Sequence, residues 1–123
     1  MVAPKRILVI EDDPDIRFTL VQAMRRAGLA VDAAVDGVEG LERLRDGAVP
    51  SLILLDLRLP WLCGDEFLRA MREDESYAHV PVITMTAGTA PTEDDGVIAH
   101  LHKPFDPEDL LLIVLSVVGA SAA

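Results

Sequence analysis

The run of apolar residues at positions 52–55 constrains the fold of this chain more than any other feature of the sequence. It reads Leu-Ile-Leu-Leu, stops at Asp56 and is followed by Pro60. A run without polar alternation is typical of a strand covered on both faces, and proline cannot donate a hydrogen bond within a central ladder. We therefore predict a buried strand that ends at Asp56. The run at residues 7–10, which stops at Glu11, predicts a second strand of this kind.

Segments with helical periodicity separate the predicted strands. Asp13-Pro14 and Asp106-Pro107 each combine an N-cap residue with a proline at the first helical position. The remaining elements follow from apolar spacing, with strands at residues 29–35, 80–86 and 98–102 and helical faces at residues 38–44 and 67–71. Strands that alternate with helices at this spacing predict an α/β fold with a parallel sheet and right-handed crossovers.

The length and charge of the chain limit what it can be. Its 123 residues suit one domain over residues 1–123, without a linker or an internal repeat. With 11 Lys and Arg against 21 Asp and Glu, the net charge is -10, which disfavours nucleic acid or an anionic membrane as a direct partner. A cation or a basic protein surface matches this charge better.

Neither end of the sequence has the features of a targeting or membrane segment. The first apolar run ends at residue 10, which is too short for a secretory signal. The apolar residues 110–118 cover about half of a membrane span. Cys63 is the only cysteine and has no disulfide partner within the chain, which fits either a reducing compartment or simply an inert thiol. We expect a soluble, cytoplasmic protein.

Chemically matched side chains stand at the carboxyl ends of the predicted strands. Glu11 and Asp12 follow the strand at residues 7–10, and Asp56 follows the run at residues 52–55. Thr86 ends the strand at residues 80–86, and Lys103 follows the strand at residues 98–102. The carboxyl ends of parallel strands form the ligand-binding edge of such sheets. Three carboxylates there would repel one another unless a cation lay among them, and oxygen ligands suit a hard divalent cation such as Mg²⁺.

This set of side chains predicts phosphoryl transfer. With a cation bound, Asp56 can act as a nucleophile toward phosphorus, while Thr86 and Lys103 contact the phosphoryl oxygens. Each residue alone has an ordinary explanation, since acids are also common at helix N-termini and Lys103 precedes a proline at the surface. Five matched groups at strand ends favour a shared site over five separate coincidences.

Four stretches together resemble the receiver domain of two-component response regulators. They read ILVIEDDPDIR, LILLDLRLPWLCGDEF, PVITMTA and HKPFDPEDLL, and the resemblance covers nearly the whole chain. It implies a flavodoxin-like, doubly wound sheet of five parallel strands in the order 2-1-3-4-5, with helices on both faces.

The resemblance also implies a role for each site residue. Asp56 would accept a phosphoryl group from a sensor histidine kinase or a histidine phosphotransfer protein, in a reaction that depends on Mg²⁺ or Mn²⁺. The residues expected at the metal ion are Asp12, Asp56, the backbone carbonyl of Arg58 and, through water, Glu11. Those expected around the phosphoryl group are Thr86, Ala87 and Lys103.

A domain of this family is a signalling switch rather than a metabolic enzyme, although it promotes its own phosphorylation and dephosphorylation. We expect phosphorylation to change the binding of a downstream protein in a two-component system or phosphorelay. A stand-alone regulator and a receiver domain cut from a hybrid kinase or a larger regulator are equally compatible with the sequence.

Three features depart from the family pattern. Only 16 residues separate Thr86 from Lys103, fewer than usual, so we predict a short or irregular fourth helix. His100 stands where the family has an aromatic switch residue, and it either changes rotamer on phosphorylation or only packs at the end of the strand. The last helix is apolar nearly all round, so it either packs fully or docks a partner or a second copy of the chain.

Other classes of function remain open at this point. A receiver-like module that binds proteins without phosphate is favoured by the short segment and His100, and disfavoured by the presence of all five site groups. A phosphohydrolase of the haloacid-dehalogenase type needs a second aspartate where Arg58 stands. A flavodoxin would meet repulsion between its flavin phosphate and the acids at residues 11–13.

Overall fold

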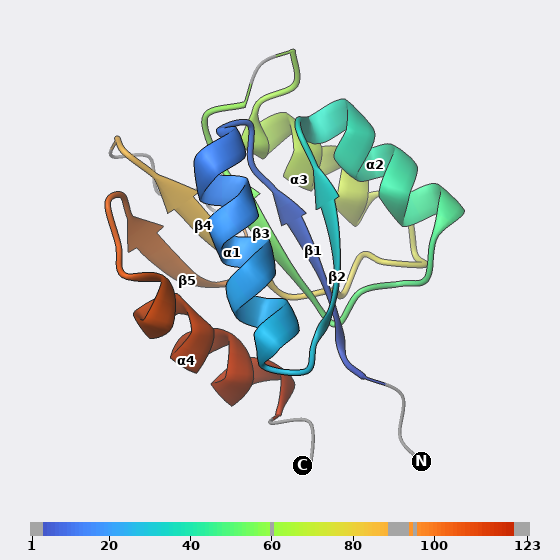
Figure 1. Cartoon of the computed structure of the whole chain (residues 1–123). Helices are drawn as coiled ribbons and strands as arrows, with labels where there is room; N and C mark the ends of the chain where they lie inside the picture. Colours follow the sequence, from blue (N-terminus) through green and yellow to red (C-terminus); the bar gives the residue numbers. More distant parts are fainter. Residues whose placement is uncertain (1–3, 60, 89–93, 95, 120–123) are drawn as a thin grey trace.

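Five parallel strands form one central sheet (Figure 1). The computed structural model describes residues 4–59, 61–88, 94 and 96–119. The strands pair in the order β2-β1-β3-β4-β5, and every pair is parallel. The strands are β1 (Arg6–Ile10), β2 (Ala30–Ala34), β3 (Leu52–Asp56), β4 (Val82–Thr86) and β5 (Val97–His102). The order confirms the predicted doubly wound sheet.

Helices cover both faces of this sheet, as predicted. The helices are α1 (Pro14–Arg26), α2 (Gly37–Asp46), α3 (Gly64–Arg72) and α4 (Pro107–Val118). The carboxylate of Asp13 accepts hydrogen bonds from the first-turn amides of α1, and Asp106 does the same for α4. Both Asp-Pro pairs therefore start helices in the way the sequence indicates.

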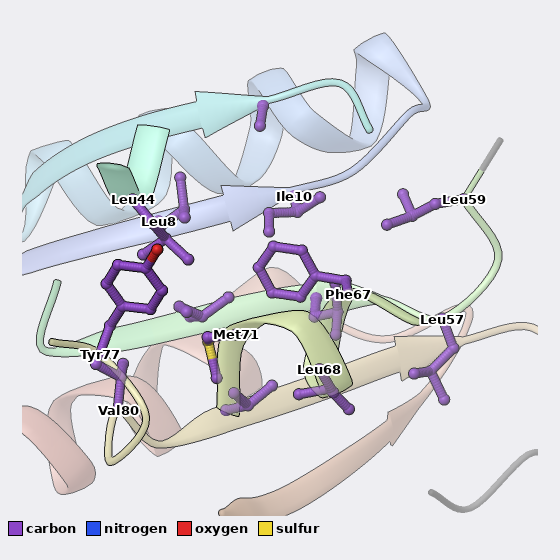
Figure 2. Packing of buried hydrophobic residues seen from close by; sticks show 14 residues of the cluster. Leu8, Ile10, Leu44, Leu57, Leu59, Phe67, Leu68, Met71, Tyr77 and Val80 are labelled. Atoms are coloured by element: carbon purple, nitrogen blue, oxygen red, sulfur yellow. The ribbon is translucent and has the colours of Figure 1, made fainter. Parts of the chain in front are cut away.

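Two apolar cores result from the alternation of side chains along β1 and β3. Ile7, Val9, Leu52 and Leu54 pack against α1 and α4, and the cluster on that face includes Leu20, Met24, Leu110 and Val114. Leu8, Ile10, Ile53 and Leu55 point the other way, toward α2 and α3, where the cluster includes Leu44, Phe67, Leu68 and Met71 (Figure 2). Every residue of β3 is buried, as the run at residues 52–55 predicts.

The face of α2 toward the core differs in detail from the prediction. Val38 is exposed, and Gly37, Gly40 and Leu44 are the buried residues of this helix. A Cβ atom at Gly40 would lie 2.6 Å from Cδ1 of Ile10 and 3.0 Å from Cε1 of Phe67. The glycine therefore allows α2 to approach the sheet closely, a packing requirement that apolar spacing alone does not reveal.

The margin of the sheet at β5 is less covered than its centre. Half-buried and exposed residues alternate along β5, and Ile98 is 47% exposed. No helix lies on the described residues between β4 and β5, which are 87, 88, 94 and 96. The predicted short or irregular fourth helix would fall largely on residues 89–93 and 95, which lie outside the described residues.

An ion pair attaches the start of β5 to the end of α3. The Arg72 guanidinium lies 2.8 Å from Oδ1 of Asp94 and also donates to the backbone carbonyls of Ala78 and Val80. The bond from Arg72, the largest influence, lowers the pKa of Asp94 below its usual value. One side chain thus connects α3, the turn before β4 and the approach to β5.

Across the part of the chain that the structure describes, no helix is both long enough and apolar enough to span a membrane.

Candidate functional site

The register of the central strands brings the predicted acids together. Ile10 of β1 lies opposite Leu55 of β3, so Glu11 and Asp56 follow as neighbours at the carboxyl ends of the two strands. Ligand oxygens of Glu11, Asp12 and Asp56 lie within 4.8 Å of one another. Glu11 and Asp56 are buried, whereas Asp12 is exposed at the mouth of the cluster. The three carboxylates therefore form one site that is open on one side.

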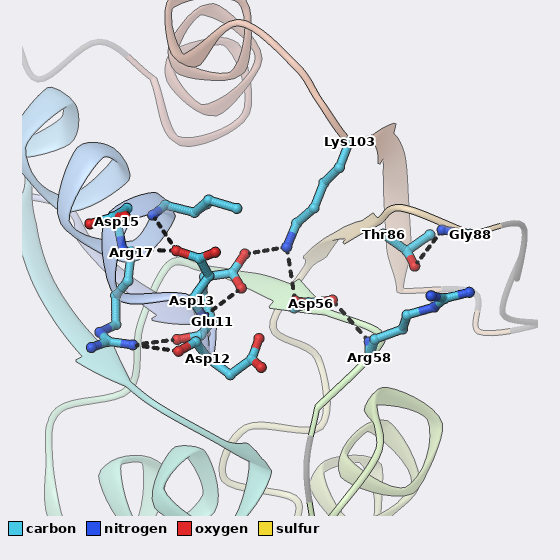
Figure 3. Close-up of polar contacts among 11 residues, drawn as sticks. Glu11, Asp12, Asp13, Asp15, Arg17, Asp56, Arg58, Thr86, Gly88 and Lys103 are labelled. Atoms are coloured by element: carbon cyan, nitrogen blue, oxygen red, sulfur yellow. Dashed lines mark hydrogen bonds and ion pairs between the residues drawn. The ribbon is translucent and has the colours of Figure 1, made fainter.

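Lys103 closes this cluster from the edge of the sheet. Thr86 of β4 lies opposite His102 of β5, so Lys103 is the next residue after the paired segment. Its Nζ atom donates to Oε1 of Glu11 at 2.6 Å and to Oδ2 of Asp56 at 2.9 Å (Figure 3). One ammonium group thus neutralises part of the charge of two buried carboxylates from two different strands.

The proton affinities of these groups reflect their burial and their pairing. Burial is the largest influence on Glu11, and the bond from Lys103 offsets it only in part, so its pKa rises from 4.5 to about 7. Asp56 raises the pKa of Glu11 further, as a neighbouring acid should. For Lys103, burial alone would lower the pKa, but the bonds to Glu11 and Asp56 prevail and raise it. Lys103 is therefore a cation throughout the neutral range.

The remaining predicted residues line the same end of the sheet. Thr86 is buried, and its hydroxyl accepts a hydrogen bond of 3.2 Å from the amide of Gly88. The amide of Arg58 donates to Oδ1 of Asp56 at 2.9 Å. Ala87 and Lys103 both line a cavity of about 460 Å³ beside the acids. Glu11, Asp12, Lys103 and the Arg58 amide thus lie at Asp56, and Thr86 ends the neighbouring strand β4. The predicted metal-binding role of the Arg58 carbonyl stays a prediction.

The hydrogen bond that the structure gives His100 is with Thr84 and not with the acid cluster. His100 is exposed on β5, and its Nδ1 atom lies 2.5 Å from the hydroxyl of buried Thr84. Thr84 is not among the predicted site residues, although a threonine between Ile83 and Met85 in a buried strand indicates a polar contact on one face.

Arg17 is a second residue at the site that was not predicted from the sequence. Its Nη1 atom donates to the backbone carbonyls of Glu11 at 2.9 Å and Asp12 at 3.2 Å. The arginine thus fixes the turn between β1 and α1 that carries the acid pair. Its place in the first turns of an amphipathic helix gives no sequence signal for this contact.

A model of the response regulator receiver domain matches residues 7–115 of this chain. The chain belongs to the response regulator receiver domain family. Receiver domains are parts of two-component systems and serve as signalling switches, which agrees with the acid cluster and the lysine described above.

Curated relatives extend over most of this chain but are often much longer than it. Protein Rrf1 of Nitratidesulfovibrio vulgaris is 38% identical over 113 residues, which cover 90% of this chain and 80% of that protein. The DNA-binding dual master transcriptional regulator RpaA of Synechocystis sp. is 40% identical, and the match covers 86% of this chain and 46% of RpaA. Hybrid signal transduction histidine kinase D of Dictyostelium discoideum is 31% identical, with 95% of this chain matched to 8% of the kinase.

Solved structures of receiver domains superpose on nearly the whole chain. The chemotaxis response regulator CheY4 of Vibrio cholerae has a TM-score of 0.82 and 29% identity, covering 93% of this chain and 98% of CheY4. The receiver domain of sensor histidine kinase PA1611 from Pseudomonas aeruginosa PAO1 has a TM-score of 0.79 and 31% identity, covering 95% of this chain and 99% of that domain. That crystal structure has a magnesium ion coordinated in its active site cleft.

Proposed function

We propose that this receiver domain, formed by residues 1–123, accepts a phosphoryl group on Asp56 from a sensor histidine kinase or a histidine phosphotransfer protein. The observation that carries the proposal is the contact of Lys103 with both Glu11 and Asp56. A lysine between two buried acids at the carboxyl end of a parallel sheet suits transfer of an anionic group. Family membership supports the same chemistry.

The acid cluster fits a hard divalent cation such as Mg²⁺ or Mn²⁺. Carboxylate and carbonyl oxygens are the ligands such ions prefer, and the three acids converge within 4.8 Å. Asp12, Asp56 and the backbone carbonyl of Arg58 would hold the ion directly, and Glu11 would act through water. The bound cation would supply neutralising charge for the phosphoryl oxygens. Magnesium in the cleft of the PA1611 receiver domain supports this assignment by similarity.

The side chains of this domain provide the rest of the proposed mechanism. Asp56 presents its carboxylate as the nucleophile, with Oδ1 oriented by the Arg58 amide. Lys103 pairs with phosphoryl oxygens once the transfer begins, and the Thr86 hydroxyl donates a hydrogen bond to another of these oxygens. Ala87 leaves space beside them because it carries only a methyl group. Attack by an Asp56 oxygen forms the new oxygen–phosphorus bond as the bond from phosphorus to the donor nitrogen breaks.

Apolar surface near the site and on α4 favours contact with two kinds of protein, the phosphodonor and a downstream partner. The apolar cavity of about 460 Å³ includes Ile16 and Leu20 of α1 and Phe105 of the loop before α4. A donor protein can bury apolar surface there while its phosphohistidine approaches Asp56. On α4, Leu112 is 68% exposed, which leaves an apolar contact for a downstream partner or a second copy. We place this signalling role in the cytoplasm.

Intact mass spectrometry after incubation with acetyl phosphate tests the proposal. Wild-type protein should gain one phosphoryl group in the presence of Mg²⁺ and none in the presence of EDTA. Asp56→Asn should gain none under either condition. Asp46→Asn is a matched control, because Asp46 lies with Arg6 beside a cavity at the opposite end of β1.

A phosphate-independent interaction module is the competing function, and it predicts a different result. Wild-type protein would then gain no mass although Mg²⁺ still changed the fluorescence of Trp61, the exposed tryptophan of the loop after β3. The exposed position of His100 in place of an aromatic switch residue is the observation that favours this alternative.

A further inference from the structure

Two exposed histidines lie on one face of the edge strand β5. His100 and His102 are two residues apart, and their paired residues on β4 are Thr84 and Thr86. Side chains at i and i+2 of a strand point to the same side, with Cα atoms about 6.6 Å apart. Both histidines are exposed in the structure. The strand therefore presents two imidazole rings side by side.

The hydrogen bonds of both rings involve the same nitrogen. Nδ1 of His100 lies 2.5 Å from the Thr84 hydroxyl, and Nδ1 of His102 lies 3.4 Å from the backbone oxygen of Lys103. Within residues 4–59, 61–88, 94 and 96–119, the structure gives neither Nε2 atom a hydrogen-bond partner. A ring that donates Nδ1–H to an oxygen has its lone pair on Nε2, which is the arrangement found in histidine ligands of metals.

We propose that His100 and His102 form a binding site for a borderline transition-metal ion of the Zn²⁺ class. Neutral imidazole nitrogens suit Zn²⁺, Cu²⁺ and Ni²⁺, whereas Mg²⁺ prefers oxygen ligands. Two Nε2 atoms on a tetrahedral Zn²⁺ ion lie about 3.3 Å apart, which rings from adjacent same-face positions of a strand reach by tilting toward each other. Water would complete the coordination on the solvent side.

Thr84 acts in this site as a positioning residue. Its hydroxyl is buried and accepts Nδ1–H of His100 in the metal-bound tautomer, which orients the ring and makes Nε2 the ligand. The net charge of -10 raises the local concentration of cations around the whole domain. Neither histidine is a member of the cluster formed by Glu11, Asp12 and Asp56, and the proposed zinc site does not require phosphorylation of Asp56.

Titration with ZnCl₂ in excess MgCl₂ tests the proposal, because Mg²⁺ occupies carboxylate sites that would compete for zinc. In long-range ¹H–¹⁵N spectra of the histidine rings, Zn²⁺ should shift the Nε2 resonances of His100 and His102. Calorimetry should show that His100→Ala and His102→Ala each weaken zinc binding by about tenfold or more, the scale on which even outer contacts of metal ligands act. Both side chains are exposed, so these substitutions leave no cavity in the core.

His79→Ala is the matched control, since His79 is the third histidine of the chain and lies before β4. It should leave zinc affinity unchanged, whereas Thr84→Val should weaken binding because the His100 ring loses its oxygen partner. The proposal is overturned if the Nε2 resonances do not move. It is also overturned if His100→Ala/His102→Ala binds zinc as tightly as wild type, or if only Asp12→Asn and Asp56→Asn lose zinc.

Discussion

The strands β3 and β5 differ in how the sheet surrounds them. All five residues of β3 are buried between two helical layers, whereas half-buried and exposed residues alternate along β5. β3 lies at the centre of the sheet and ends at Asp56, while β5 lies at the edge and leads into Lys103. The two residues nevertheless meet at 2.9 Å between Nζ and Oδ2.

The two strands therefore contribute differently to the site, since the centre of the sheet provides the acids and its edge provides the lysine. The covered centre holds the acids in fixed positions, and burial raises the free energy of their charged forms. The open edge supplies a cation, Lys103, on a long and flexible side chain. In the proposed function, this side chain exchanges its carboxylate partners for phosphoryl oxygens. We therefore expect substitutions at the centre to affect stability strongly and those on the open face of β5 to affect it weakly.

Phe67→Ala should have the largest effect, at the covered centre. The Phe67 ring is fully buried among residues of α2, α3 and β1, so its loss leaves a cavity. We expect the free energy of unfolding to fall by about 4 kcal/mol, measured by urea denaturation. A change below about 1 kcal/mol would show that this core repacks freely. It would contradict the expectation that substitutions at the covered centre affect stability strongly.

Lys103→Met should follow, because it leaves Glu11 and Asp56 buried without their cation. We expect a loss of about 3 kcal/mol near pH 8 without Mg²⁺. Excess Mg²⁺ should recover part of this loss, since a divalent cation can neutralise the same carboxylates. Lys5→Met is the matched control, because Lys5 is the only other lysine and is exposed. Equal stability of the two variants would mean that Lys103 does not neutralise the acids.

Glu11 should make stability depend on pH in the absence of Mg²⁺. Its pKa is about 7 in the folded state against an ordinary 4.5, so the folded protein keeps a proton that the unfolded chain has released. The free energy of unfolding should therefore fall as pH rises through this window, by about 2 kcal/mol between about pH 5 and about pH 8. Urea denaturation across this range should show the slope in wild type and a much smaller one in Glu11→Gln. Parallel curves for the two proteins would refute the assignment.

Ile98→Thr should have the smallest effect, on the open face of β5. Ile98 is 47% exposed, and threonine keeps the β-branched shape that strands favour. We expect a change within about 0.5 kcal/mol in urea denaturation. A loss comparable to that of Phe67→Ala would show that this face is as well packed as the centre.

The central strands and the helices beside them could be predicted from the sequence because local patterns of residues determine them. Continuous apolar runs identify β1 and β3, and Asp-Pro pairs locate the starts of α1 and α4. Parallel strands then bring their carboxyl ends to one edge, so the meeting of Glu11, Asp56 and Lys103 follows from topology.

Contacts between distant side chains could not be predicted in the same way. Arg17 reaches the carbonyls of Glu11 and Asp12, and Arg72 reaches Asp94, through rotamers that spacing along the chain does not specify. The close approach of α2 at Gly40 likewise depends on the shapes of Ile10 and Phe67. The spacing of residues 38–44 also places Val38 on the apolar face of the helix, yet Val38 is exposed, because apolar spacing gives the face of a helix only approximately.

Locating the phosphoryl group on the chain shows directly whether Asp56 is the phosphoacceptor. Protein treated with acetyl phosphate and Mg²⁺ is reduced with borohydride, which converts an aspartyl phosphate to homoserine, and its peptides are then sequenced by mass spectrometry. We predict homoserine at position 56 and aspartate at position 12. Homoserine at position 12, or a phosphorylated protein without homoserine at position 56, would contradict the assignment of Asp56 as the phosphoacceptor.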